Sequence, residues 1–235
     1  MKHIIFYKSF LMFVFYCCCI CSCAQNKRPS KILNQKEFKP LVATSLKLIK
    51  ESCTCGSVRG FRYRISYDNR IDTEDGYCNY SYDPVLRASD SLKIQILADL
   101  LEAIGDTSLC CKAVKKYGSN NNTKAEPRSK NYNLQIDALF TFNFIAFGVE
   151  AKKYAPYPVL YDTLTNEEIN NDFQKINEVA LLYKKWYKLV SKTGFTNYTF
   201  PLINTRYRWY GAINKKRVLD KLPTHPKVDN LGHSY

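Results

Sequence analysis

The spacing of apolar residues along the chain predicts a mainly helical protein. In three long stretches apolar residues recur every three or four positions, the period of a helix with one buried face. We therefore expect helices over residues 40–52, 90–104 and 165–193, each bounded by a capping residue or a glycine. A fourth stretch, residues 134–147, is apolar at nearly every position and predicts a helix buried on all sides.

Two shorter stretches, residues 61–67 and 77–82, alternate apolar and polar side chains as β-strands do. They predict a β-hairpin around an acidic loop. A short second helix from Asp106 to Gly118 would complete an αα-hairpin, whereas two prolines make residues 154–162 non-helical. The predicted fold class is mainly α, of α+β type, a helical domain with a small β-hairpin near residues 58–82.

Composition divides the chain into segments. Residues 119–131 are polar, low in complexity and without an apolar anchor, which predicts a linker. This linker separates residues 34–118, which contain the N-terminal helix, the hairpin and the αα-hairpin, from a C-terminal helical lobe over residues 132–235. Two further segments, residues 1–22 and 23–33, precede them.

The first 22 residues are typical of a signal peptide. Lys2 and Lys8 accompany the apolar run of residues 10–16. Next comes Ile20-Cys21-Ser22-Cys23, which resembles the lipobox of bacterial lipoprotein precursors, with an aliphatic residue three positions before the cysteine and small residues between.

This resemblance implies cleavage after Ser22 and acylation of Cys23. Residues 23–33 would then be a lipidated tether, short, polar and basic. Cleavage before Gln25, releasing a secreted protein, is one alternative. A short membrane anchor that is never cleaved is another.

The overall composition is that of a basic globular protein. The 235 residues include 35 Lys or Arg and 21 Asp or Glu, a net charge of +14, and 46% are hydrophobic, too many for a disordered chain. Loss of residues 1–22 would lower the basic count by two to 33 and the net charge to +12. We expect no internal stretch to approach the roughly 20 apolar residues of a membrane-spanning helix.

Five cysteines remain after Cys23, and an oxidising compartment would favour disulfides among them. Immediate neighbours pair only under strain, so we expect links between the cysteine-containing segments. Because five is an odd number, at least one thiol stays free or pairs outside the chain. Thiolate ligation of zinc or copper(I) is the alternative, but the spacing fits no standard pair, and we expect no metal and no cofactor. The candidates are Cys53, Cys55, Cys78, Cys110 and Cys111.

The C-terminal segment mixes basic and aromatic residues, and we predict an interaction surface there. Such a composition suits single-stranded nucleic acid, but export argues against that partner and we expect no nucleic acid. Anionic headgroups, polyanionic glycans or an acidic protein are more available in an envelope, and an acidic protein is the partner that we predict. Alternatively, the aromatic rings pack on the helices while the arginines reach solvent. The candidates are Arg206, Arg208, Trp209, Tyr210, Lys215, Lys216 and Arg217.

No motif predicts catalytic chemistry. The chain has no GxSxG, HExxH, phosphate-binding glycine loop or dinucleotide fingerprint. We therefore expect an exported lipoprotein of the cell envelope, on its periplasmic side or its surface, that acts by binding. Its partner would be a protein or an envelope component, as for an immunity-type inhibitor. The alternative is an envelope hydrolase or a thiol-active enzyme with an unrecognised site.

Overall fold

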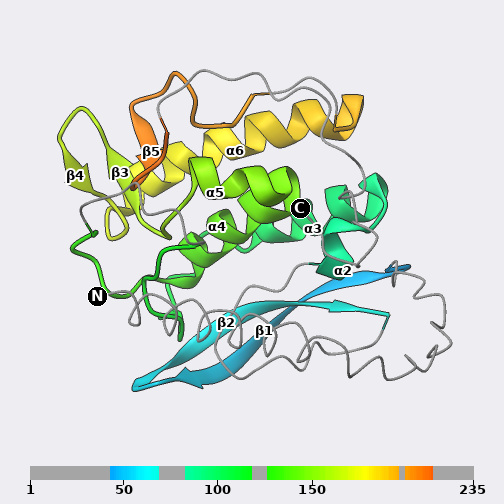
Figure 1. The fold of residues 1–235 in the computed structure, drawn as a ribbon, viewed down its shortest axis with the longest axis horizontal. Coiled ribbons are helices and arrows are strands. Elements are labelled where there is room, and N and C mark those ends of the chain that lie inside the picture. The colour runs from blue at the N-terminus through cyan, green and yellow to red at the C-terminus, as the bar shows by residue number, and fades with distance from the viewer. Residues whose placement is uncertain (1–42, 69–82, 118–125, 196–198, 214–235) are drawn as a thin grey trace, which may run out of the picture. The chain divides into compact units, whose positions relative to one another are not determined.

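The structure is a computed structural model that describes residues 43–68, 83–117, 126–195 and 199–213 (Figure 1). These residues form helices and two antiparallel sheets, in agreement with an α+β fold. The elements are β1 (Leu46–Cys55), β2 (Val58–Tyr67), α2 (Asp83–Leu86), α3 (Asp90–Glu102), α4 (Leu134–Phe147), the 3-10 turn η1 (Gly148–Glu150), α5 (Ala151–Tyr154), β3 (Leu160–Asp162), β4 (Glu167–Glu168), α6 (Phe173–Thr193) and β5 (Tyr207–Trp209).

The longer sheet is a hairpin of β1 and β2, which pair antiparallel with Leu46 opposite Tyr67 and Cys55 opposite Val58. The two-residue turn between them begins at Gly56, whose φ of 59° lies in the left-handed region that favours glycine.

The helix predicted over residues 40–52 is therefore wrong where the structure describes it, because residues 46–52 belong to β1. Leu48 and its cross-strand neighbour Ile65 pack against the core, as do Leu46 and Tyr67, so the core-facing apolar residues recur with a period of two. The predicted hairpin partner is also wrong, since β2 pairs with the strand before it. The other predicted strand, residues 77–82, lies outside the described residues.

The second helix of the predicted αα-hairpin is absent from residues 106–117. The backbone here forms strand-like bonds to both sides: Phe61 N–H donates to the Leu109 carbonyl (2.9 Å), and Cys110 N–H to that of Tyr132 (2.9 Å). Asp106, where this helix was expected to begin, instead accepts the Ser108 N–H (3.0 Å) in a tight turn.

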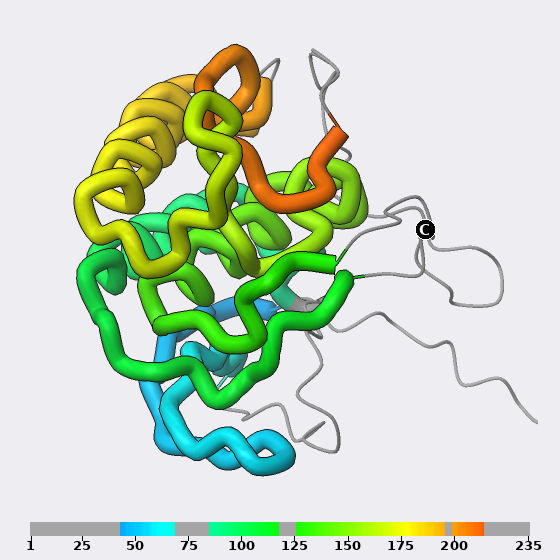
Figure 2. Tube along the Cα trace, turned by 90° about the vertical axis from the view of Figure 1, so that its left-hand side faces the viewer, coloured from blue at the N-terminus to red at the C-terminus, as the bar shows by residue number. Residues whose placement is uncertain are grey.

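Helices α3 and α4 lie between the hairpin and α6 (Figures 1 and 2). Both were predicted, and every residue of α4 is buried. The helical run Leu134–Tyr154 is long and apolar enough to cross a membrane, contrary to our expectation for internal segments. However, 83% of its most apolar window is buried inside the fold, so protein contacts account for its composition.

Helix α6 was predicted, but it begins later than its apparent capping box at residues 165–168. Asp172 caps it by accepting the Lys175 N–H (3.1 Å). The Glu168 carboxylate instead accepts backbone N–H groups of Arg128 and Ser129 at 2.6 and 2.8 Å. The buried side of α6 contributes Tyr183 and Trp186, which pack edge-on against Phe142 of α4.

The non-helical segment predicted over residues 154–162 is wrong at Tyr154, which ends helix α5. Residues 155–162 are non-helical and end in β3, the central strand of the smaller sheet. Leu160 of this strand pairs with Trp209 of β5.

Gly60 of β2 allows the hairpin to approach residues 109–111, and its replacement should destabilise the fold. A Cβ atom at this position would lie 2.3 Å from the Leu109 carbonyl oxygen. We expect Gly60→Ala to lower the free energy of unfolding by about 2 to 3 kcal/mol, measured by urea titration. Ser52→Ala, on the exposed side of β1, is the control. Equal stability of the two variants would contradict this packing.

Candidate functional site

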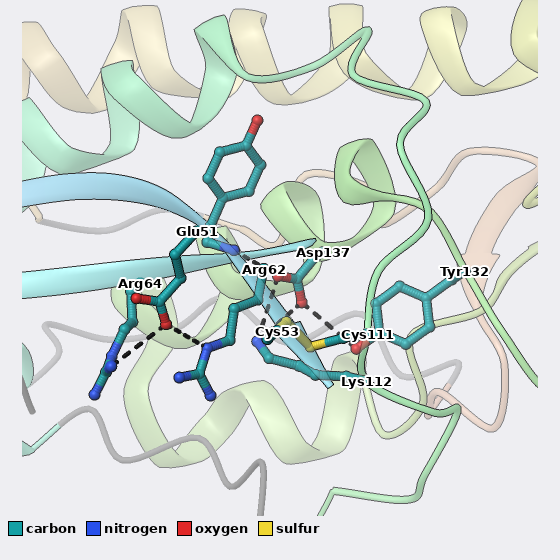
Figure 3. The surroundings of a disulfide bond; sticks show 9 residues. Glu51, Cys53, Arg62, Arg64, Cys111, Lys112, Tyr132 and Asp137 are labelled. Carbon is teal, nitrogen blue, oxygen red and sulfur yellow. Dashed lines mark hydrogen bonds and ion pairs between the residues drawn. A yellow bond between two sulfur atoms is a disulfide. The ribbon is translucent and has the colours of Figure 1, made fainter. Parts of the chain in front are cut away.

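A disulfide links Cys53 of β1 to Cys111, 58 residues away in sequence (Figure 3). Gly60 lies opposite Cys53 in the hairpin, and residues 109–111 lie directly against Gly60. The Cys111 N–H also donates to the Phe61 carbonyl (2.9 Å). The disulfide therefore ties β1 to a segment that hydrogen bonds hold to β2. It joins two of the segments between which the sequence favoured links.

Cys110, next to this disulfide, is a free and fully buried thiol. Burial raises the pKa of Cys110 to about 12, and the nearby charge of Asp137 adds to this effect. The thiol is therefore protonated at neutral pH, whereas a reactive cysteine needs the thiolate. Cys55 is also disulfide-bonded. The remaining candidates, Cys23 and Cys78, lie outside the described residues.

A buried ion pair lies beside the disulfide (Figure 3). Asp137 of α4 is fully buried, and the Lys112 ammonium lies 3.2 and 3.3 Å from its two carboxylate oxygens. The Tyr63 N–H and the Tyr132 hydroxyl each lie 3.5 Å from the same carboxylate. Because a buried carboxylate without a partner is costly, this pair fixes α4 relative to residues 110–112.

Sequence analysis did not identify this pair, although a signal was present. Asp137 is the one charged residue in the apolar stretch 134–147. A lone charge in a helix apolar on all sides requires a buried counter-charge.

Charged groups of the hairpin also form ion pairs, some of them beside the disulfide. Glu51, opposite Arg62, accepts the Arg62 Nε–H at 2.6 Å and an Arg64 N–H at 3.3 Å (Figure 3). Lys50 lies 2.6 Å from Asp106.

The Asp106 carboxylate is a second polar link between the hairpin and the segment that follows α3. Burial opposes its ionisation, but hydrogen bonds from Lys50, Ser108 and Tyr63 outweigh burial and lower the pKa of Asp106 to about 2. Asp106 is therefore ionised at neutral pH and binds the Lys50 ammonium and the Tyr63 hydroxyl of the hairpin.

The predicted interaction surface at the C-terminus is only partly exposed. Trp209 is fully buried, which corrects its assignment to that surface. Pairing with Leu160 places Trp209 in the core, where its indole N–H donates to the Tyr183 hydroxyl (2.8 Å). That hydroxyl in turn donates to Asn143 of α4 (2.7 Å).

Arg206 is held by the fold. Its guanidinium lies 3.2 Å from Glu178 of α6 and 3.8 Å from the buried Asp162, over the ring of Tyr207. Burial opposes ionisation of Asp162, but the Leu164 N–H and its two cationic neighbours outweigh burial and lower its pKa. Arg206 thus has a structural partner on each side.

Arg208 and Tyr210 lie at the surface near the smaller sheet. The Arg208 guanidinium stacks over the ring of Tyr161 at 5.1 Å, and the Tyr210 hydroxyl donates to the Glu126 carbonyl (3.2 Å). The other candidates, residues 215–217, lie outside the described residues.

A pocket of about 390 Å³ opens beside Arg208, within the size range of small-ligand sites, roughly 300–1,000 Å³. Among the described residues that line it, Arg208 alone is charged. The lining residues are Tyr154, Thr163, Asn166, Phe200, Leu202, Ile203, Asn204, Thr205, Tyr207, Arg208, Trp209, Ala212 and Ile213.

Within the described ranges, no group of three or more His, Cys, Asp or Glu side chains could hold a metal ion. No protein-family model, curated protein or solved structure matches the chain. The features of the chain that bear on its function are therefore the disulfide, the pocket and the sequence signals.

Removing Lys112 should expose the cost of the buried Asp137 carboxylate. We expect Lys112→Met to lower the free energy of unfolding by about 3 to 5 kcal/mol. The double variant Lys112→Met/Asp137→Asn should recover part of that loss, because the remaining side chain is neutral. Urea titration of the three proteins measures both effects. A double variant less stable than Lys112→Met would show that the pair does not act in this way.

Proposed function

We propose that the protein is an exported, lipid-anchored protein of the cell envelope that acts by binding an acidic partner. The disulfide between Cys53 and Cys111 is the observation that carries export, because structural disulfides persist in oxidising compartments. It agrees with the signal-peptide pattern of residues 1–22 and with the lipobox cysteine, Cys23.

The state of the cysteines favours binding over the thiol-active alternative. Cys53, Cys55 and Cys111 are disulfide-bonded, and burial keeps Cys110 protonated. The buried carboxylates give no better support to a hydrolase. Asp137 and Asp162 each face cationic partners, and neither lines the pocket.

Arg208 is the group that we assign to recognition. It lines the pocket, stacks on Tyr161 and forms no ion pair with any residue that the structure describes. A guanidinium in this setting can form charge-assisted hydrogen bonds with a carboxylate. The partner would insert an acidic side chain or a C-terminal carboxylate beside Arg208, as the target of an immunity-type inhibitor could.

The lipid anchor can be tested by detergent phase partition of the protein from cells. We expect it in the detergent phase, and Cys23→Ser should move it out of that phase because no acyl chain is attached. Equal partition of both proteins, or a mature chain that begins at Gln25, would contradict the anchor.

The recognition site can be tested by cross-linking in cells followed by purification. We expect Arg208→Gln to lower recovery of a specific acidic protein by about tenfold or more, because a charge-assisted hydrogen bond contributes roughly 1.5 to 3 kcal/mol. Arg59→Gln, which removes an exposed arginine of the hairpin, should leave recovery unchanged. Equal recovery with both variants, or a protein without any partner, would contradict the proposal.

A further inference from the structure

The outward face of α6 combines exposed lysines with exposed leucines, and contacts within the fold do not explain this combination. Helix α6 lies on the outside of the domain in both views (Figures 1 and 2), with its buried side toward α3 and α4. Its C-terminal half presents four exposed lysines together with Leu181 and Leu189, which are 65% and 52% exposed. The lysines are Lys184, Lys185, Lys188 and Lys192.

Ion pairing within the fold does not account for these lysines. None of the four forms an ion pair with a residue that the structure describes. Glu178, the acidic residue of α6 nearest to them, already binds Arg206 and Tyr207. The outward face therefore has four positive charges without a described counter-charge.

The helix dipole explains only part of this pattern. A cation is stabilised near a helix C-terminus, but the effect is confined to the last turn, where Lys192 lies. Lys184 and Lys185 lie further back along the helix. Leu181 precedes them on the same side and is 65% exposed, so the face combines positive charge with apolar surface.

We propose that this face of α6 docks on an anionic membrane surface. The lysine ammonium groups would contact the phosphates of anionic headgroups, and Leu181 and Leu189 would enter the interfacial layer. The inference rests on the proposed lipid anchor in one respect, since the anchor keeps α6 at high local concentration near such a surface.

A membrane fits this face better than a protein partner does. Lysine is depleted at the centres of protein interfaces, where aromatic and arginine anchors fill pockets. The exposed face of α6 is a single convex helix surface with lysines and two leucines. A lipid surface requires no pocket and adapts to lysines wherever they lie.

The test uses the chain from residue 23 onward with Cys23→Ser, so that no acyl chain or signal segment contributes. Sedimentation with vesicles of phosphatidylcholine alone, or of phosphatidylcholine mixed with phosphatidylglycerol, measures binding. We expect binding to the anionic vesicles only, weakening as salt is added. Replacing the four lysines with glutamine should lower the affinity by roughly 600-fold, since each lysine near an anionic surface contributes roughly fivefold.

The control variant removes the same number of charges elsewhere on the exposed surface. Its substitutions are Lys47→Gln, Arg59→Gln, Lys115→Gln and Lys130→Gln. It should bind anionic vesicles nearly as well as the unaltered chain, whereas Leu181→Asn should weaken binding even at high salt.

Equal loss of vesicle binding in the two four-charge variants would overturn the proposal, as would no binding to anionic vesicles. Capture of an acidic protein that depends on the α6 lysines, with unchanged vesicle binding, would assign the face to a protein instead. Because the test chain carries no acyl group, these results are independent of the detergent partition that tests the anchor.

Discussion

The close approach of the hairpin to residues 109–111 is the constraint on which the rest of the structure depends. An isolated two-stranded hairpin is at best marginally stable in water. Here Gly60 lets a third strand-like segment approach β2, and backbone hydrogen bonds hold that segment there. The Cys53–Cys111 disulfide makes the contact covalent between segments distant in sequence.

Two polar contacts in otherwise apolar surroundings hold helix α4 between the hairpin and α6. On the side of the hairpin, Asp137 pairs with Lys112. Asn143 accepts the Tyr183 hydroxyl on the side of α6, where Tyr183 also accepts the Trp209 indole N–H. Apolar packing alone would tolerate rotation of α4 about its axis. These contacts fix which side of α4 faces the hairpin and which side faces α6. The outward face of α6 then remains for a function outside the fold.

The sequence predicted the elements whose periodicity is long and uniform. Helices α3, α4 and α6 follow from their apolar patterns, and α4 is buried on all sides as its composition indicates. The start of α6 was misplaced because Glu168 resembles a capping residue, although its carboxylate binds the backbone of a distant segment. Local motifs cannot show such long-range partners.

The first strand of the hairpin, β1, was predicted as a helix for a related reason. Residues 40–52 have apolar spacing compatible with a helix, and the choice of strand depends on burial against β2 and the helices. The Gly56-Ser57 pair was a usable signal, since a glycine followed by serine between two short runs is typical of a two-residue hairpin turn. For the candidate site, the sequence correctly indicated that the segments containing Cys53 and Cys111 are linked. It offered burial of the aromatic rings as an alternative but could not single out Trp209, because the burial of Trp209 depends on the packing of β5.

The disulfide-linked hairpin is tested most directly by peptide mapping of the protein purified from membranes without reductant, after alkylation of accessible thiols. We expect a linked peptide that contains Cys53 and Cys111. Cys110 should resist alkylation until the protein is denatured, and Cys23 should carry the acyl groups. Alkylation of Cys53, Cys110 and Cys111 in the native protein would contradict the covalent link between the hairpin and residues 109–111.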